Sequence, residues 1–354
     1  MIIDEKNKPK FIISKKRVFE NYDMLFQISD LVSYSFKTNP IIGNILFEKE
    51  EENLFLSIHS INELNQVKNL NSKKIWFFGL AWNEDELEIL FEKYNLENFV
   101  VDNLNDLNIL LEFIKKNNKK INLLLRMKLK ENTIFTGKHY VFGMYLKEIE
   151  SVIDDLYLNS NIGKLGIHFH RKTQNVSEWS LKDEVVEVLG KKILNKINLI
   201  NVGGGLPGKY KNSHDKTLLV IFDKLKELKK ELNSYNIEVI IEPGRFIANS
   251  AVILKSKIIA IHNKNIFLNV SIFNGMLDTV VANVKLLVEG ELERGEKYLL
   301  KGCTPDSSDI LRYSVYLSKP KVGGKIVFLN CGAYTYQTNF CALDKIETEI
   351  VEKF

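Results

Sequence analysis

Short apolar runs alternate with amphipathic stretches over the first two thirds of the chain. The amphipathic stretches repeat with a helical period, as in 104–119, where Leu107, Leu110, Leu111 and Ile114 share one stripe. Eight strands alternating with helices predict a parallel (β/α)8 barrel, whose strands are buried on both faces. An open doubly wound sheet also alternates, but eight units favour the barrel. The apolar runs lie at 31–36, 53–58, 74–79, 97–101, 121–127, 165–170, 197–202 and 238–242.

The pattern changes after Arg245. Short apolar strands follow one another there, separated by glycine-containing turns without helices, at 252–260, 266–270, 285–288, 297–300 and 325–330. A lone strand at 10–14 has no place in the barrel and is expected to join them. We therefore expect two domains, a barrel over 17–245 and a β domain formed by 1–16 and 246–354.

Composition and charge exclude several classes of partner. The 354 residues carry a net charge of +4 from mixed basic and acidic residues, which gives no basic stripe and predicts no nucleic-acid partner. The N-terminus is charged from residue 4, and no run of about 18 apolar residues occurs, so we expect no membrane segment and a cytoplasmic protein. Cys303, Cys331 and Cys341 lack metal-type spacing, so neither a disulfide framework nor a zinc site is expected.

Lys37 stands at the end of the first barrel strand, in the segment YSFKTNP that begins at Tyr34 and ends at Pro40. A buried amine at the end of an apolar strand is costly unless the protein uses it. We therefore expect Lys37 to carry a cofactor as a Schiff base.

Glycine-rich segments follow the last two barrel strands, where phosphate groups commonly bind in this fold. VGGGLPG follows the seventh strand and EPGR the eighth. Glycines let backbone N–H groups approach a phosphate, and Arg245 is suited to its oxygens. Glu242 ends the eighth strand and needs a cationic partner, either Arg245 or the protonated ring nitrogen of a cofactor that serves as an electron sink.

Two histidines, His168 and His170, alternate along the sixth strand and are expected on one face. They are either a core and a rim histidine or the start of a metal site, which would need further ligands at other strand ends. Because His59 is the only other histidine near such an end, no metal is expected.

Together these residues resemble the pyridoxal-phosphate-dependent decarboxylases of the alanine racemase fold, or fold type III. That family includes ornithine, diaminopimelate and carboxynorspermidine decarboxylases. The resemblance covers most of the chain in the family's motif order, through YSFKTNP, SIHSINEL, GIHFH, NVGGGLPG, EPGRF, GCTPDSSDIL and LNCGAYT. It implies removal of the α-carboxylate from an amino acid with a polar or charged side chain, a diamino acid or an amino-acid conjugate, to give an amine.

The resemblance also implies residue roles. Catalysis would rest on Lys37, His170 and Cys303, with Cys303 protonating the substrate Cα, while Asp306 would bind substrate. In this family the active sites are shared across a homodimer, with GCTPDSSD supplied by the second subunit. Pyridoxal 5'-phosphate would be held by Lys37, His170, Thr173, Gly203, Gly204, Gly205, Glu242, Gly244, Arg245 and Tyr334.

The chain departs from the family pattern at several positions. The usual Gly-Pro-Thr-Cys-Asp-Ser reads here Gly-Cys-Thr-Pro-Asp-Ser, which exchanges Cys303 and Pro305. The proton donor is therefore either Cys303 or one of water, His170 and Lys37. In the second case Cys303 would be a buried thiol. Ser57 and Asn201 replace usual aspartates. The segment after His170 is more basic than usual, so Arg171 or Lys172 either is solvated or binds a second carboxylate or phosphate of the substrate.

Two alternatives remain. Racemases of this fold place an arginine against the pyridine nitrogen, and Glu242 speaks against that chemistry. A catalytically silent homologue that binds a partner protein is motivated by the Cys303 and Pro305 exchange, whereas the presence of Lys37, His170 and the glycines argues against it.

Overall fold

The structure, a computed structural model, describes residues 8–129, 141–170, 179–213 and 217–354. The chain forms two compact units. The barrel unit comprises Tyr22–Pro207 and Lys216–Gly244, and the sheet unit comprises Met1–Asn21, Gly208–Asp215 and Arg245–Phe354. Residues 208–213 thus fold with the sheet unit, although they lie between barrel strands in the sequence.

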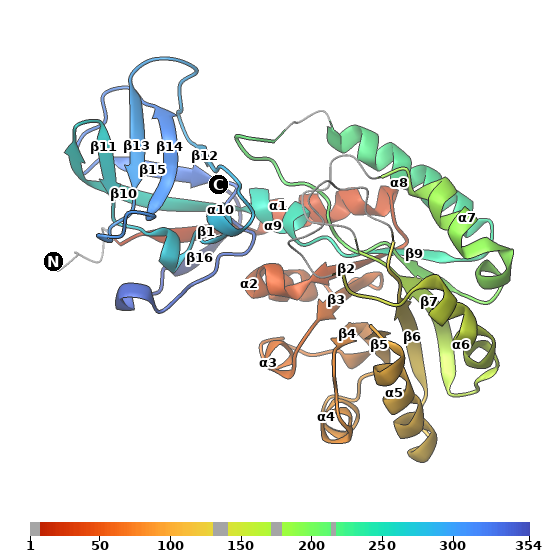
Figure 1. Cartoon of the computed structure of the whole chain (residues 1–354). Helices are drawn as coiled ribbons and strands as arrows, with labels where there is room; N and C mark the ends of the chain where they lie inside the picture. The colour runs from red at the N-terminus through yellow and green to blue at the C-terminus, as the bar shows by residue number, and fades with distance from the viewer. Residues whose placement is uncertain (1–7, 130–140, 171–178, 214–216) are drawn as a thin grey trace. The chain divides into compact units, whose positions relative to one another are not determined.

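The barrel unit is built on a closed barrel of parallel strands (Figure 1). The predicted (β/α)8 barrel is confirmed, and pairing of the last strand with the first closes it. The strands are β2 (Leu31–Ser35), β3 (Leu54–Ile58), β4 (Ile75–Gly79), β5 (Asn98–Val101), β6 (Ile121–Arg126), β7 (Ile162–His168), β8 (Leu199–Asn201) and β9 (Glu238–Ile241).

Helices follow the strands and surround the barrel (Figure 1). In α5, Asn103 accepts the backbone N–H of Asp106 as N-cap, and Lys115 and Lys116 lie in the last turn, where the helix dipole favours cations. Phe113, rather than the predicted Leu111, completes its buried stripe. The helices are α2 (Pro40–Phe47), α3 (Ile61–Leu64), α4 (Glu84–Glu88), α5 (Leu104–Lys116), α6 (Leu146–Leu158), α7 (Leu181–Leu194) and α8 (Thr217–Asn233).

Inward-facing side chains change from apolar to polar toward the carboxyl ends of the strands. An apolar cluster fills the interior, formed by Trp76, Phe78, Val100, Leu124, Leu199 and Ile240. Residues two apart on a strand share a face, so the position after Val100 that faces inward is Asp102, and the one after Leu124 is Arg126. Six polar residues occupy such positions near the carboxyl ends of the strands, namely Ser57, Asp102, Arg126, His168, Asn201 and Glu242.

The sheet unit is organised around an eight-stranded sheet in the order β12-β15-β10-β11-β13-β14, with β1 pairing β10 and β16. The lone N-terminal strand therefore joins the β domain, as predicted. The unit also contains α1 (Lys15–Asp23), α9 (Arg245–Ala248) and α10 (Asp278–Val281). The strands are β1 (Lys10–Ser14), β10 (Val252–His262), β11 (Asn265–Leu268), β12 (Leu287–Val288), β13 (Lys297–Lys301), β14 (Ile310–Tyr316), β15 (Lys325–Leu329) and β16 (Glu347–Val351).

The β domain differs from the prediction in three elements. The expectation of no helices between its strands was wrong, because α10 lies between β11 and β12. Strands β14 and β16 were not predicted. Most residues of β16 are exposed, so no apolar run marks this strand, and its parallel pairing with β1 forms it instead.

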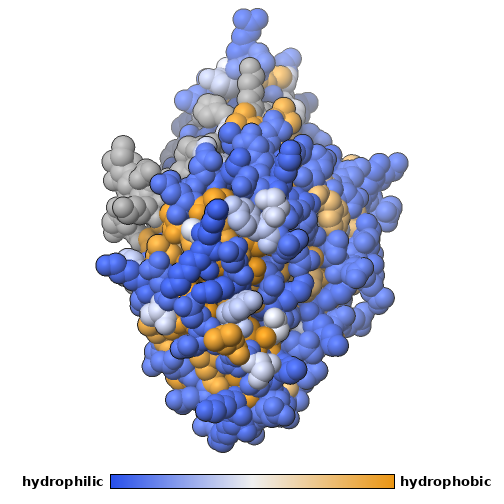
Figure 2. Space-filling view, turned by 90° about the vertical axis from the view of Figure 1, so that its right-hand side faces the viewer, coloured by the Kyte–Doolittle hydropathy of each residue, from blue (hydrophilic) through white to orange (hydrophobic). Residues whose placement is uncertain are grey.

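No helix among the described residues is long and apolar enough to cross a membrane. Figure 2 shows one face of the molecule, on which hydrophilic residues predominate and apolar residues form separate patches.

Candidate active site

Lys37 lies in the turn between β2 and α2. A 3-10 helix, Phe36–Thr38, follows the strand, and the Asn39 side chain then caps α2 by accepting the backbone N–H groups of Ile41 and Ile42. The expectation of a buried amine was wrong, since Lys37 is exposed and its Nζ has no hydrogen bond or ion pair within the part of the chain that the structure describes.

The charge state of Lys37 is nevertheless perturbed. Desolvation by the surrounding protein lowers the pKa of its amine, and the nearby carboxylates of Glu242 and Glu63 offset this only in part. A larger share of the amine is therefore neutral, which is the nucleophilic form.

Glu242 is buried at the end of β9, and its partners come from the barrel itself. Oε1 accepts hydrogen bonds from Ser57 Oγ at 3.1 Å and Asn201 Nδ2 at 2.8 Å, and Oε2 lies 3.3 Å from His168 Nε2. Burial alone would raise the pKa of Glu242, but the interactions with His168 and Asn201 hold it well below its usual range. Glu242 is thus a carboxylate at neutral pH.

His168 is buried in the interior, and its ring is neutral. Burial lowers its pKa and outweighs the attraction of Glu242. Because an ionised carboxylate only accepts, His168 Nε2 carries the hydrogen, and Nδ1 has no partner within the described residues. The described residues contain no group of three or more metal-type side chains.

His170 lies two residues beyond the end of β7 and is exposed. Its Nδ1 accepts the backbone N–H of Gly204 at 3.1 Å, which fixes the ring. Desolvation by the surrounding protein lowers the pKa of His170, so the ring is neutral and carries its hydrogen on Nε2.

The glycine turn after β8 lies too close to its neighbours for any side chain. A Cβ on Gly203, whose φ is +68°, would lie 2.5 Å from the carbonyl oxygen of Phe169. A Cβ on Gly204 would lie 2.7 Å from the carbonyl oxygen of Glu242. After β9, a Cβ on Gly244 would lie 2.1 Å from Thr38 Oγ1. These glycines are required by the fold, and they leave the backbone of both turns bare.

Arg245 begins α9 in the sheet unit and pairs with Asp278. Nη1 lies 2.5 Å from Asp278 Oδ2 and from the Tyr210 hydroxyl, and Nη2 lies 3.1 Å from Asp278 Oδ1. Burial would lower the pKa of Arg245, but these partners raise it, so the guanidinium stays charged. Its Nε is buried without a partner among the described residues.

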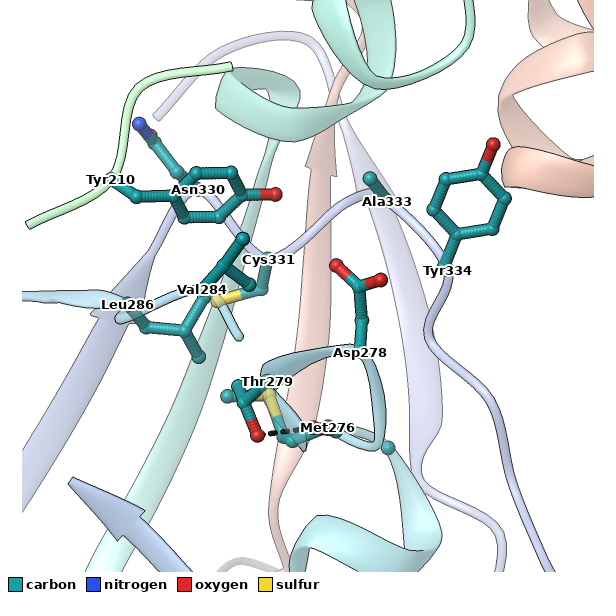
Figure 3. A pocket seen from close by; sticks show the side chains of 11 residues that line it. Tyr210, Met276, Asp278, Thr279, Val284, Leu286, Asn330, Cys331, Ala333 and Tyr334 are labelled. Carbon is teal, nitrogen blue, oxygen red and sulfur yellow. Dashed lines mark hydrogen bonds between the residues drawn. The ribbon is translucent and has the colours of Figure 1, made fainter. Parts of the chain in front are cut away.

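The surroundings of Arg245 form a small pocket in the sheet unit (Figure 3). Asp278, Tyr210 and Tyr334 are among its lining residues, together with the buried thiol of Cys331. The guanidinium carbon lies 5.0 Å from the ring centroid of Tyr334, which has a left-handed φ of +53°. Arg245 is therefore held by three side chains that are distant from it in the sequence.

The segment GCTPDSSD is a loop of the sheet unit anchored by Asp309. This fully buried carboxylate accepts the backbone N–H of Ile272 at 3.0 Å and both the N–H and the hydroxyl of Thr304. The alternative of a buried thiol was wrong, because Cys303 is exposed. Desolvation and the charge of Asp309 raise the pKa of Cys303, which keeps its proton on sulfur.

Two predicted site residues, Thr173 and Arg171, lie outside the described residues, as does Lys172. Sequence reasoning missed the hydrogen-bonding roles of Ser57, Asn201 and His168 and the anchoring role of Asp309. The signal for the first three is their spacing, since each lies on the inward face of its strand.

Comparison with known proteins decides the family. Residues 14–249 match the model of the pyridoxal-dependent decarboxylase family, in its pyridoxal binding domain. The chain belongs to this family. It is 24% identical over 331 residues to a probable ornithine decarboxylase of Dictyostelium discoideum, covering 85% of this chain and 69% of that protein. It is 27% identical over 361 residues to the diaminopimelate decarboxylase of Bacillus methanolicus, covering 92% and 82%.

Solved structures of the family share the fold of this decarboxylase. The structure of diaminopimelate decarboxylase from Helicobacter pylori, complexed with L-lysine, superimposes with a TM-score of 0.83 at 19% identity, over 98% of this chain and 92% of that one. The predicted pyridoxal-phosphate-dependent amino-acid decarboxylase, a carboxy-lyase of the alanine racemase fold, is confirmed.

The residues of the decarboxylase fit pyridoxal phosphate. In the barrel unit, the amine of Lys37 is accessible and has no partner among the described residues, and the hydroxyl of the next residue, Thr38, is buried and likewise has no partner there. Glu242 supplies a carboxylate for a cationic ring nitrogen, and the bare glycine turns suit phosphate oxygens. In the sheet unit, Arg245 has an unused buried Nε–H donor.

Proposed function

We propose that this decarboxylase acts on an amino acid with a charged far end, and that Lys37 binds the cofactor covalently. The observation that carries the proposal is the Lys37 amine, which has a lowered pKa and lies at the end of β2 in the same barrel as the ionised Glu242. A neutral amine and a fixed carboxylate are the two groups that a bound pyridoxal ring requires.

The remaining binding roles follow the same proposal. Gly203, Gly204, Gly205 and Gly244 bind the phosphate through backbone N–H groups, and Arg245, which follows Gly244 in the chain, and Tyr334 contribute from the sheet unit. Thr173 stays a predicted hydrogen-bond donor to cofactor oxygens. The cofactor-binding region that we propose is 17–245, and within it 17–21, 208–213 and Arg245 belong to the sheet unit.

Bound there, pyridoxal phosphate supplies a ring that accepts the electron pair released when the α-carboxylate leaves as carbon dioxide. Glu242 would hold the ring nitrogen protonated, and the neutral His170 ring, fixed by Gly204 N–H, would cover the ring face. The raised pKa keeps the Cys303 thiol protonated at Sγ, so this thiol would be the proton donor to the substrate Cα. Lys37 would supply the amine that holds the cofactor between turnovers.

The substrate that we propose is a diamino acid. The relatives named above are ornithine and diaminopimelate decarboxylases, whose substrates carry a second amine. Hydrogen bonds from Ser308 lower the pKa of Asp306, which supplies an ionised partner for a far ammonium group. Arg171 stays the predicted contact for a second substrate carboxylate.

We propose a homodimer with shared active sites, in which the Cys303 and Asp306 loop of one subunit serves the barrel of the other. Support comes from the exposure of Cys303 and the firm anchoring of its loop by Asp309. We also propose a cytoplasmic location, which is consistent with three free cysteines.

Carbon dioxide release from matched substrates tests the proposal. Lysine and norleucine differ by the far amine, so the enzyme loaded with pyridoxal phosphate is assayed with this pair, with ornithine and with diaminopimelate, in L- and D-forms. We expect release from at least one diamino acid, none from norleucine, and loss of release in Lys37→Ala. Release from norleucine as fast as from the best diamino acid would contradict the diamino specificity, and racemised product without carbon dioxide would contradict the decarboxylase.

A further inference from the structure

The carboxylate of Glu242 is held asymmetrically. Oε1 accepts two hydrogen bonds, from Asn201 Nδ2 at 2.8 Å and Ser57 Oγ at 3.1 Å. Among the described residues, the hydrogen-bond neighbour of Oε2 is one ring nitrogen, His168 Nε2, at the longer distance of 3.3 Å. Oε1 is therefore satisfied, whereas Oε2 retains the capacity to accept a further donor.

Asn201 ties this carboxylate to the glycine turn. While its Nδ2 donates to Glu242, its Oδ1 accepts the backbone N–H of Gly203 at 2.9 Å. The backbone N–H of Glu242 also donates to the carbonyl oxygen of Gly203 at 2.8 Å. One fully buried amide thus sets the positions of both the carboxylate and the turn.

Ser57 is oriented from its other side. Its Oγ lies 2.8 Å from the Oγ of Ser33 on the neighbouring strand β2, and both serines are fully buried. Because the hydrogen of Ser57 is used toward Glu242, Ser57 accepts the hydrogen of Ser33. Ser33 contacts Ser57 without contacting the carboxylate, which makes it a matched control position.

The donors around Oε1 are neutral. A cation there would neutralise Glu242 and compete with a cationic ring nitrogen, whereas neutral donors stabilise the negative charge without cancelling it.

We propose that Asn201 and Ser57 are positioning residues that hold Glu242 ionised and leave its Oε2 for the protonated ring nitrogen of pyridoxal phosphate. The inference rests on the proposed function, because it requires Glu242 to face that nitrogen. Asn201 and Ser57 would then affect the affinity for pyridoxal phosphate indirectly, by orienting the Glu242 carboxylate.

A cofactor analogue with carbon in place of the ring nitrogen isolates this contact. Dissociation constants of pyridoxal phosphate and its 1-deaza analogue are measured for the apoprotein by fluorescence titration. The wild type is expected to prefer pyridoxal phosphate. In Asn201→Ala, which removes the donor to Glu242 together with the acceptor for Gly203 N–H, the preference is expected to fall by about tenfold or more, and in Ser57→Ala by somewhat less.

Ser33→Ala is the control. It is expected to retain the wild-type preference for pyridoxal phosphate, because Ser57 still reaches Glu242. An unchanged ratio in both Asn201→Ala and Ser57→Ala, with the two ligands weakened equally, would overturn the inference and indicate a purely structural role. If Asn201→Ala does not fold, Ser57→Ala alone decides.

Failure of the proposed function is distinguishable from failure of the inference. A wild type that binds neither ligand contradicts the proposed function and the inference with it. A wild type that binds pyridoxal phosphate on Lys37, combined with a flat ratio across the variants, contradicts the inference alone.

Discussion

At the scale of residues, the barrel interior keeps its charges in defined states by burial and hydrogen bonding. Glu242 stays ionised because neutral donors surround it, while His168 stays neutral because the interior excludes its charged form. The two states support each other, since a neutral His168 donates to the carboxylate without cancelling its charge.

The neutral state of His168 predicts a pH dependence of stability. Its folded pKa lies below the unfolded value of about 6.5, so below that pH the unfolded chain takes up a proton that folded His168 does not. Stability is therefore complete above about pH 6.5 and falls as the pH decreases, by up to about 1.4 kcal/mol per pH unit from this residue.

Urea unfolding of the apoprotein between about pH 5.5 and 7.5 measures this slope. His168→Gln keeps a donor for Glu242 but does not titrate, so its slope is expected to be shallower than that of the wild type. His262→Gln, at an exposed histidine of the sheet unit, is the control and should retain the slope. Equal slopes for the wild type and His168→Gln would show that His168 is not the titrating group.

At the scale of elements, turns and loops carry the candidate functional groups, and the strands and helices hold these turns and loops in place. The glycine turn after β8 and the loop anchored by Asp309 each depend on a close backbone approach or a buried acceptor. The apolar runs predicted the strands closely, because burial on both faces leaves a clear pattern. The partners of these loops were not predictable, since Asp278 and Arg245, or Asp309 and Ile272, meet only in the folded chain.

Gly203 and Gly290 offer a matched pair of glycine substitutions. Their φ angles are +68° and +69°, but a Cβ on Gly203 would meet the carbonyl oxygen of Phe169 at 2.5 Å, whereas one on Gly290 meets nothing within 4 Å. Gly290→Ala is expected to cost about 1 kcal/mol of stability with unchanged cofactor affinity. Gly203→Ala displaces the turn and should weaken pyridoxal phosphate binding about tenfold or more in a fluorescence titration. Equal affinity in the two variants would contradict a role for the turn.

The Asp309 anchor predicts a large loss of stability on truncation. Asp309→Ala leaves two backbone N–H groups and the Thr304 hydroxyl without their buried acceptor, which should cost about 3 kcal/mol or more in urea unfolding. Asp306→Ala, in the same loop but with a side chain that is hydrogen-bonded only to Ser308 among the described residues, is the control and should change stability by about 0.5 kcal/mol or less. Similar losses in both variants would refute the anchor.

At the scale of the whole molecule, sequence patterns predicted the barrel and the β domain, and they singled out candidate cofactor residues whose roles stay predictions. Lys37, His170 and the glycines were recognisable because each lies at or just after the end of a barrel strand. The exposure of Lys37 and Cys303 was not predicted, since it depends on how the surrounding chain folds. Strand β16 was missed because pairing with β1, rather than an apolar run, defines it.

The proposed shared active site predicts complementation between inactive subunits. Lys37→Ala and Cys303→Ala homodimers are each expected to lack most activity, because every site misses one group. Random exchange makes about half of the dimers mixed, and each mixed dimer has one intact site, so the mixture should recover about a quarter of wild-type carbon dioxide release. Recovery after mixing and refolding is the measurement. No recovery, with exchange verified by mass spectrometry of the dimers, would place both residues in one subunit's site.

Covalent labelling of Lys37 tests the central claim most directly. The wild-type protein is loaded with pyridoxal phosphate, reduced with borohydride to fix the lysine bond, digested and examined by peptide mass spectrometry. We expect the phosphopyridoxyl label on the peptide that contains Lys37, and its absence from that peptide in Lys37→Arg. A label on another lysine of the wild type, or an unlabelled protein at saturating cofactor, would contradict the account.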